Sequence, residues 1–181
     1  GIPVSFLNEG AARHLITQPS ADFDLDYNPE AIETVIRLTH GQPYLIQLIC
    51  HSLVSRFNRQ MFEEDRSGTP KPERRFHLTD IEVVVAAPEL FRDGDAYFKG
   101  VWNQPEEREA VAQHTLLHIL AVSEHGLPCE ELVAQSALSP TAVQHALNIL
   151  ARHDVIAEHD GTWSFTVELM RRWVAHKNAN V

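Results

Sequence analysis

The chain has 181 residues, which is enough for one large or two small domains. Hydrophobic residues make up 44%, and 25 acidic against 15 basic side chains give a formal net charge of −10, which repels nucleic acid at long range. No apolar run is long enough to span a bilayer, and no segment has the pattern of a secretory signal. We therefore expect a cytoplasmic protein without a membrane partner.

The first half of the chain carries the start and stop signals of several helices, which indicates a small helical bundle. Asn8 can cap a helix that runs to about Thr17 and ends before Pro19. Asn28 followed by Pro29 predicts a second helix start, because a capping side chain precedes a first-turn proline. Gly41 ends that helix, and the next one is apolar on most sides through residue 57, so we expect it at the centre of the bundle.

A charged, proline-containing stretch at about residues 63–76 follows, and we expect it to be a flexible loop. Thr79 and Asp80 start a further helix, and an aromatic-rich segment ends at Trp102. These elements define a predicted helical domain over residues 1–104.

The second half, residues 105–181, has a different order of elements. Pro105 opens a long helix, and two shorter helices follow at 128–137 and from Ser139-Pro140 onward. Residues 155–159 and 162–165 have the alternating side-chain pattern of β-strands, and Asp160-Gly161 lies between them. An Asp-Gly pair between two such segments is among the strongest short hairpin signals. Three helices and a hairpin, closed by a helix at 167–176, predict a winged helix-turn-helix. The expected fold class is mainly α, with a small β-hairpin wing.

The turn Gly41-Gln42-Pro43, followed by Tyr44, is the most informative feature of the chain. A glycine turns the chain and a proline opens the next helix, so the turn has a fixed shape and a bare backbone. Such a turn can lie flat against a planar ligand such as adenine. On its own, a GxP triplet marks only the end of one helix and the start of the next. Whether it has a function must therefore be judged from the surrounding sequence.

The surrounding segment, LTHGQPYLIQLIC at residues 38–50, resembles the GxP-bearing lid helices of bacterial STAND-class P-loop ATPases, which are relatives of the AAA+ enzymes. The similarity continues through EGAARHLI at 9–16, YNPEA at 27–31, Tyr97-Phe98 with Trp102, and VELMRRWV at 167–174, in the same order. The resemblance implies a lid-type bundle followed by a winged helix. It also implies that Gly41 and Pro43 border the base and ribose of ATP or ADP in the parent protein.

The chain differs from the family pattern in two ways, and both limit the function expected of this region. Many AAA+ lids carry an arginine where this chain has Tyr44, in a GxxR pattern that reaches the γ-phosphate, so a slow switch fits better than a fast motor. No GxxxxGK[ST] loop and no strand ending in paired acids is present, so we expect no ATPase activity and no cofactor bound by this region alone. The implied role is regulatory: it couples the nucleotide state of a P-loop core in the same protein to an unknown protein effector.

The alternative is a winged-helix transcriptional regulator that binds DNA. The exposed face of its reading helix would carry Gln144, His145, Asn148 and Arg152, which is one strong cation where DNA readers place several. Residues 110–181 hold four basic and seven acidic side chains, and the wing tip is Asp160-Gly161. We therefore expect protein contacts rather than DNA, and both functions stay open here.

No metal site is expected from the sequence. His114 and His118 are four residues apart, but the zincin motif needs a glutamate where Thr115 stands, so they are expected to be ordinary histidines on a helix surface. Cys50 and Cys129 are far apart and neither belongs to a CxxC pair, which argues against structural zinc or a disulfide framework.

Overall fold

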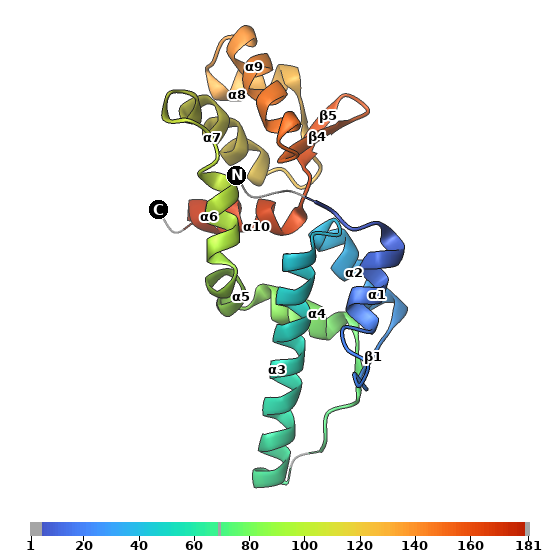
Figure 1. The fold of residues 1–181 in the computed structure, drawn as a ribbon. Coiled ribbons are helices and arrows are strands. Elements are labelled where there is room, and N and C mark those ends of the chain that lie inside the picture. The colour runs from blue at the N-terminus through green and yellow to red at the C-terminus, as the bar shows by residue number, and fades with distance from the viewer. Residues whose placement is uncertain (1–4, 69, 180–181) are drawn as a thin grey trace. The chain divides into compact units, whose positions relative to one another are not determined.

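The computed structural model describes residues 5–68 and 70–179, and it is mainly helical, as the sequence predicts (Figure 1). It also has two small sheets, of which only the β4–β5 hairpin was predicted. Its contacts divide the chain into two compact units, Ser5–Gly94 and the residues from Asp95 onward. The expected division after residue 104 falls later than this one. The reason is that Phe98 and Trp102, before residue 104, pack their rings against Trp173 near the end of the chain.

The first unit is a helical bundle with a two-residue strand pair. Its elements are α1 (Glu9–Thr17), β1 (Asp26–Tyr27), α2 (Pro29–Thr39), α3 (Pro43–Ser67), β2 (Arg75–Phe76), α4 (Leu78–Ala86) and α5 (Pro88–Asp93). The side chain of Asn8 accepts a hydrogen bond from the backbone N–H of Ala11 at 2.8 Å, so the predicted cap of α1 is confirmed. Asn28 precedes α2 as predicted, but its Nδ2 instead donates to His77 Nδ1 at 2.6 Å.

The stretch expected to be a loop at 63–76 is partly regular. The helix α3 continues to Ser67, where the left-handed Gly68 ends it, because its last turns consist largely of residues with good helix propensity. The strand β2 pairs in parallel with β1. Phe76 anchors this return: it is buried and its ring lies 5.0 Å from that of Tyr27 and 6.4 Å from that of Phe57. Only Gly68 and residues 70–74 of the described stretch lie outside helix and strand.

The second unit holds the predicted helices and hairpin. Its elements are α6 (Asp95–Trp102), α7 (Glu107–Ala121), β3 (Leu127–Pro128), α8 (Cys129–Ser136), α9 (Pro140–Arg152), β4 (Ile156–His159), β5 (Thr162–Phe165) and α10 (Glu168–Ala179). The strands form an antiparallel sheet in the order β3-β5-β4. Asp160 and Gly161 both have positive φ, 52° and 78°, so the Asp-Gly hairpin turn is confirmed. The helix expected to open at Pro105 begins instead at Glu107.

The helix α10 ties this unit together. Trp173 stacks on Phe98 at 5.8 Å, while Arg171 donates to the carbonyl of Ala121 at 2.7 Å, at the end of α7. Arg171 also donates to both carboxylate oxygens of Glu168 at 3.0 Å. Burial by itself raises the pKa of Glu168, but its hydrogen bonds and ion pairs with Arg171 and Arg172 outweigh burial and hold that pKa below its ordinary value. These two arginines are therefore engaged in structural contacts.

Within the described ranges, no helix combines the length and the apolar character needed to cross a bilayer.

Candidate functional site

The turn between α2 and α3 has a rigid backbone. His40 and Gly41 both lie in the left-handed region, with φ of 53° and 78°. The N–H of His40 donates to the carbonyl of Ile36 at 2.8 Å, and the N–H of Gln42 donates to that of Thr39 at 3.0 Å. The Thr39 hydroxyl donates to the Val35 carbonyl at 2.8 Å and accepts from the N–H of Gly41 at 3.3 Å. Hydrogen bonds therefore hold the backbone of residues 39–42 in this conformation.

Gly41 is required by the chain that packs on it. The N–H of Leu7 donates to the Gly41 carbonyl at 2.8 Å. A Cβ added to Gly41 would lie 2.5 Å from the Leu7 carbonyl oxygen, closer than side-chain carbons approach backbone atoms. The bare face of this glycine is therefore filled by the backbone of Leu7. An adenine that approached the turn would not meet that face.

The other three residues of the turn differ in what they offer to a ligand. Gln42 is only 6% exposed, and its Oε1 accepts from the N–H of Leu45 at 3.1 Å, so it caps α3. Pro43 is half-buried, and Tyr44 is 41% exposed with its hydroxyl 3.4 Å from the Asp93 carbonyl. His40 is also exposed, and its ring lies edge-on to that of Phe6 with the centroids 5.0 Å apart.

The four candidate residues on α9 are all exposed, but they divide into two groups. Gln144 Nε2 donates to Asn148 Oδ1 at 2.9 Å, one turn apart along the helix. His145 and Arg152 instead line a hollow of about 430 Å³ toward α7, where His145 Nε2 lies 3.7 Å from an oxygen of Glu109. Arg152 has no ion pair with another described residue. The four residues that were expected to form one contact face therefore lie in two separate groups on α9.

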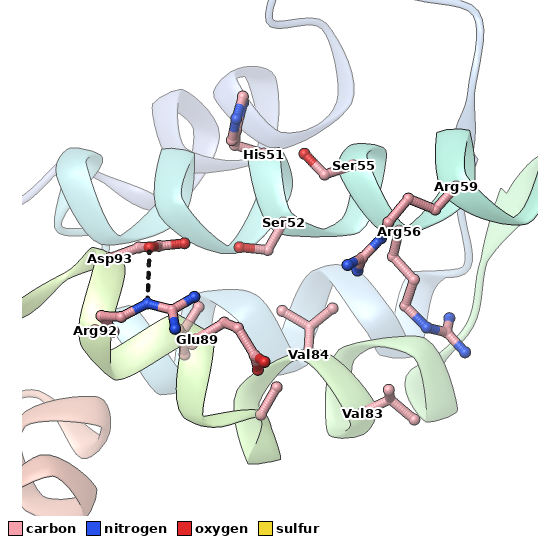
Figure 2. A pocket seen from close by; sticks show the side chains of 12 residues that line it. His51, Ser52, Ser55, Arg56, Arg59, Val83, Val84, Glu89, Arg92 and Asp93 are labelled. Atoms are coloured by element: carbon pink, nitrogen blue, oxygen red, sulfur yellow. Dashed lines mark ion pairs between the residues drawn. The ribbon is translucent and has the colours of Figure 1, made fainter.

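A second hollow, which motif reasoning did not find, lies in the first unit between α3 on one side and α4 with α5 on the other (Figure 2). It has a volume of about 460 Å³. The side of α3 that lines it is polar, and the opposite side mixes apolar and charged residues. The α3 residues are His51, Ser52, Ser55, Arg56 and Arg59, and those of the other side include Val83, Val84, Glu89 and Arg92.

The charges in this hollow are mixed. Arg56 Nη1 lies 2.8 Å from Asp80 Oδ1, and Arg92 Nε lies 3.9 Å from the neighbouring Asp93. The sequence signal for this surface is a set of polar residues with helical spacing, at positions 52, 55, 56 and 59 of α3. With acidic and basic groups both present, the hollow favours no single class of ligand, and we assign it no role.

His114 and His118 are half-buried, and His114 makes structural contacts rather than lying free on the helix surface. The ring of His114 stacks on Trp102 at 3.9 Å with the planes 2° apart, and its Nε2 donates to the Trp102 carbonyl at 2.7 Å. Burial lowers the pKa of His114, the hydrogen bond to Trp102 raises it in part, and the charges of His118 and Lys177 lower it further. Among residues 5–68 and 70–179, no group of three or more His, Cys, Asp or Glu side chains is placed to hold a metal ion.

No family model and no curated protein matches this chain.

Proposed function

We propose that this chain is the lid and winged-helix region of a STAND-like signalling ATPase. In this role it couples the nucleotide bound to a P-loop core of the same protein to contacts with a protein effector. The observation that carries the proposal is the turn from His40 to Tyr44. Its backbone is fixed on both sides, and its outward surface is made of a ring, a proline and a second ring.

The proposed nucleotide contact is the surface formed by His40, Pro43 and Tyr44. Flat, weakly hydrated side chains are suited to contact with a nucleotide base, because stacking depends on the area of contact and requires little hydrogen bonding. Gly41 and Gln42 then act indirectly: the glycine admits Leu7 and the glutamine caps α3, so both hold the turn in place. This assigns the direct contact to His40, Pro43 and Tyr44 and a positioning role to Gly41 and Gln42.

The second unit is proposed to be a winged helix that binds protein. The order of α7, α8, α9 and the β4–β5 hairpin, with β3 completing a three-stranded sheet, supports the fold. The exposed residues of α9 include a single arginine, and the hairpin tip carries Asp160. A phosphate backbone would meet that acidic tip with unfavourable charge, so a protein surface is the better partner.

The rate at which labelled ADP leaves the full-length protein tests this proposal. Base stacking contributes on the order of 1–3 kcal/mol, so Tyr44→Ala and Pro43→Ala should each raise the dissociation rate by about tenfold. Gln47→Ala is the matched control, because Gln47 is exposed on the next turn of α3 and should leave the rate unchanged. Equal rates in all three variants and the unmodified protein would remove the turn from the nucleotide site.

A further inference from the structure

A third hollow lies in the first unit, between the loop before β1 and the middle of α3. It has a volume of about 480 Å³, which is room for at least one large side chain. Part of its lining is apolar and only partly covered by the rest of the chain. The apolar lining residues are the buried Leu25 and Phe57 and the half-buried Phe23, Val54 and Met61.

Three aspartates alternate along this loop and β1, and one of them has no ion pair. Asp24 pairs with Arg74 at 2.6 Å, and Asp26 pairs with Arg75 at 3.6 Å. Asp22 is exposed, lines the hollow and has no ion pair with another described residue. The hollow therefore has one carboxylate at its rim that is available to a cation from outside.

Asn58 adds a free amide beside the apolar lining. Its side chain is exposed on α3, lines the hollow and makes no hydrogen bond with another residue of the described ranges. An asparagine side chain offers a C=O that accepts and an NH₂ that donates, which are the two groups that a peptide backbone requires. A backbone could therefore be held at this position without breaking a hydrogen bond of the folded chain.

The charges of the lining disfavour an anionic ligand. Arg74 is engaged by Asp24, and its guanidinium lies over the ring of Phe57, 5.7 Å from the centroid. With Asp22 and Asp24 against Arg74, the lining has a net charge of −1. The formal net charge of −10 of the whole chain acts in the same direction. A nucleotide, a nucleic acid or an acidic peptide would therefore be repelled, whereas a cationic partner would be attracted.

We propose that this hollow is a docking site for a basic segment of a protein partner, in which a large apolar residue stands next to an arginine or lysine. The apolar side chain packs between Phe23, Val54 and Met61. The backbone of the segment pairs with the amide of Asn58, and the cationic side chain pairs with Asp22. This contact is independent of the nucleotide site proposed above.

NMR of protein with ¹³C-labelled methionine methyl groups tests the proposal, because the chain has two methionines. Met61 lines the hollow, whereas Met170 is buried in the second unit and serves as the internal reference. Titration with N-acetyl-phenylalanyl-arginine amide should move the Met61 signal alone. We expect a dissociation constant on the order of 1 mM, because an open hollow encloses only part of so small a ligand. N-acetyl-glycyl-arginine amide lacks the apolar side chain and should bind about tenfold more weakly.

Two variants test the polar contacts at exposed positions that make no hydrogen bond or ion pair in the folded chain. Asp22→Asn should weaken the arginine peptide by about threefold, as expected for an exposed ion pair, and leave the uncharged N-acetyl-phenylalanyl-glutamine amide unaffected. Asn58→Ala should weaken both peptides alike, by about fivefold. Glu82→Gln is the matched control for Asp22→Asn, because Glu82 is exposed on α4 outside the hollow and its loss should change neither affinity.

Three results would overturn the proposal. One is a Met61 signal that does not move up to about 10 mM peptide. Another is binding without the proposed selectivity: equal affinities for the phenylalanyl and glycyl peptides, or an arginine peptide that binds Asp22→Asn as well as the unmodified protein. The third is a Met61 signal that shifts with protein concentration in the absence of peptide, which would mean that a second copy of the chain covers the hollow.

Discussion

Replacement of Gly41 by alanine should destabilise the first unit strongly. A residue with a side chain at φ of 78° costs about 1–2 kcal/mol, because its Cβ crowds the following carbonyl. The added Cβ would also lie 2.5 Å from the Leu7 carbonyl oxygen, a backbone atom that cannot rotate away. Overpacking of this kind costs about 1–3 kcal/mol, and moving Leu7 also loses its 2.8 Å hydrogen bond, worth about 1 kcal/mol.

The sum is a loss of about 3–6 kcal/mol, slightly offset by the lower entropy of the unfolded alanine chain. Gly68→Ala is the matched control: Gly68 also has a positive φ, 72°, but nothing lies within 4 Å of its added Cβ. We expect this control to lose about 1 kcal/mol or less. The comparison therefore isolates the contact with Leu7 from the cost of the left-handed backbone.

The assay is urea unfolding of the two variants followed by circular dichroism at 222 nm. Hydrogen exchange with mass spectrometry then assigns the loss to residues 5–94. Tryptophan fluorescence reports only the second unit, since Trp102, Trp163 and Trp173 all lie there. If Gly41→Ala were no less stable than Gly68→Ala, the close approach of Leu7 would be refuted, and Gly41 would again be free to contact a ligand.

Three further predictions follow from other parts of the chain. Duplex DNA should bind no tighter than roughly 10⁻⁴ to 10⁻⁶ M in fluorescence anisotropy at moderate salt, and sequence-selective nanomolar binding would instead support the transcriptional regulator. The endoprotease that cuts after glutamate should cleave first at Glu73, which is exposed and outside helix and strand, and an earlier cut after Glu130 or Glu131 within α8 would contradict the division into units. Stability of the second unit should fall as the pH drops below about 6.5: the unfolded chain takes up a proton at the ordinary pKa of His114, 6.5, whereas the folded chain does so only at lower pH. His114→Gln should flatten this dependence in melts between about pH 5 and 7, and an unchanged slope would exclude His114 as its source.

The parts of the fold that depend on local chemistry could be predicted from the sequence. Asp160-Gly161 specifies a turn through two residues that tolerate positive φ, and Ser139 caps α9 by accepting from the N–H of Ala142 at 3.1 Å. The aromatic segment before residue 104 is the buried helix α6. Each of these features is decided within a few residues, so a pattern in the sequence is enough to reveal it.

The parts that depend on distant residues could not be predicted. Asn28 has the sequence signature of a cap, but its side chain bonds His77, which lies 49 positions away. The parallel pairing of β1 with β2 likewise joins segments whose proximity only the folded chain creates. At the candidate site the sequence predicted a turn of fixed shape, and the hydrogen bonds of residues 39–42 agree with it, but the contact that covers Gly41 comes from Leu7, far away in the sequence. Sequence alone therefore could not assign the exposed surface to Pro43 and Tyr44.

Photolabelling of the full-length protein with azido-adenine nucleotide tests most directly whether the turn from His40 to Tyr44 lies against a nucleotide base. The account predicts that the label enters the tryptic peptide of residues 38–56, at His40, Pro43 or Tyr44, and that excess unlabelled ADP prevents it. Efficient labelling that spares this peptide, or protein that takes up no nucleotide at all, would contradict the proposed role of the lid.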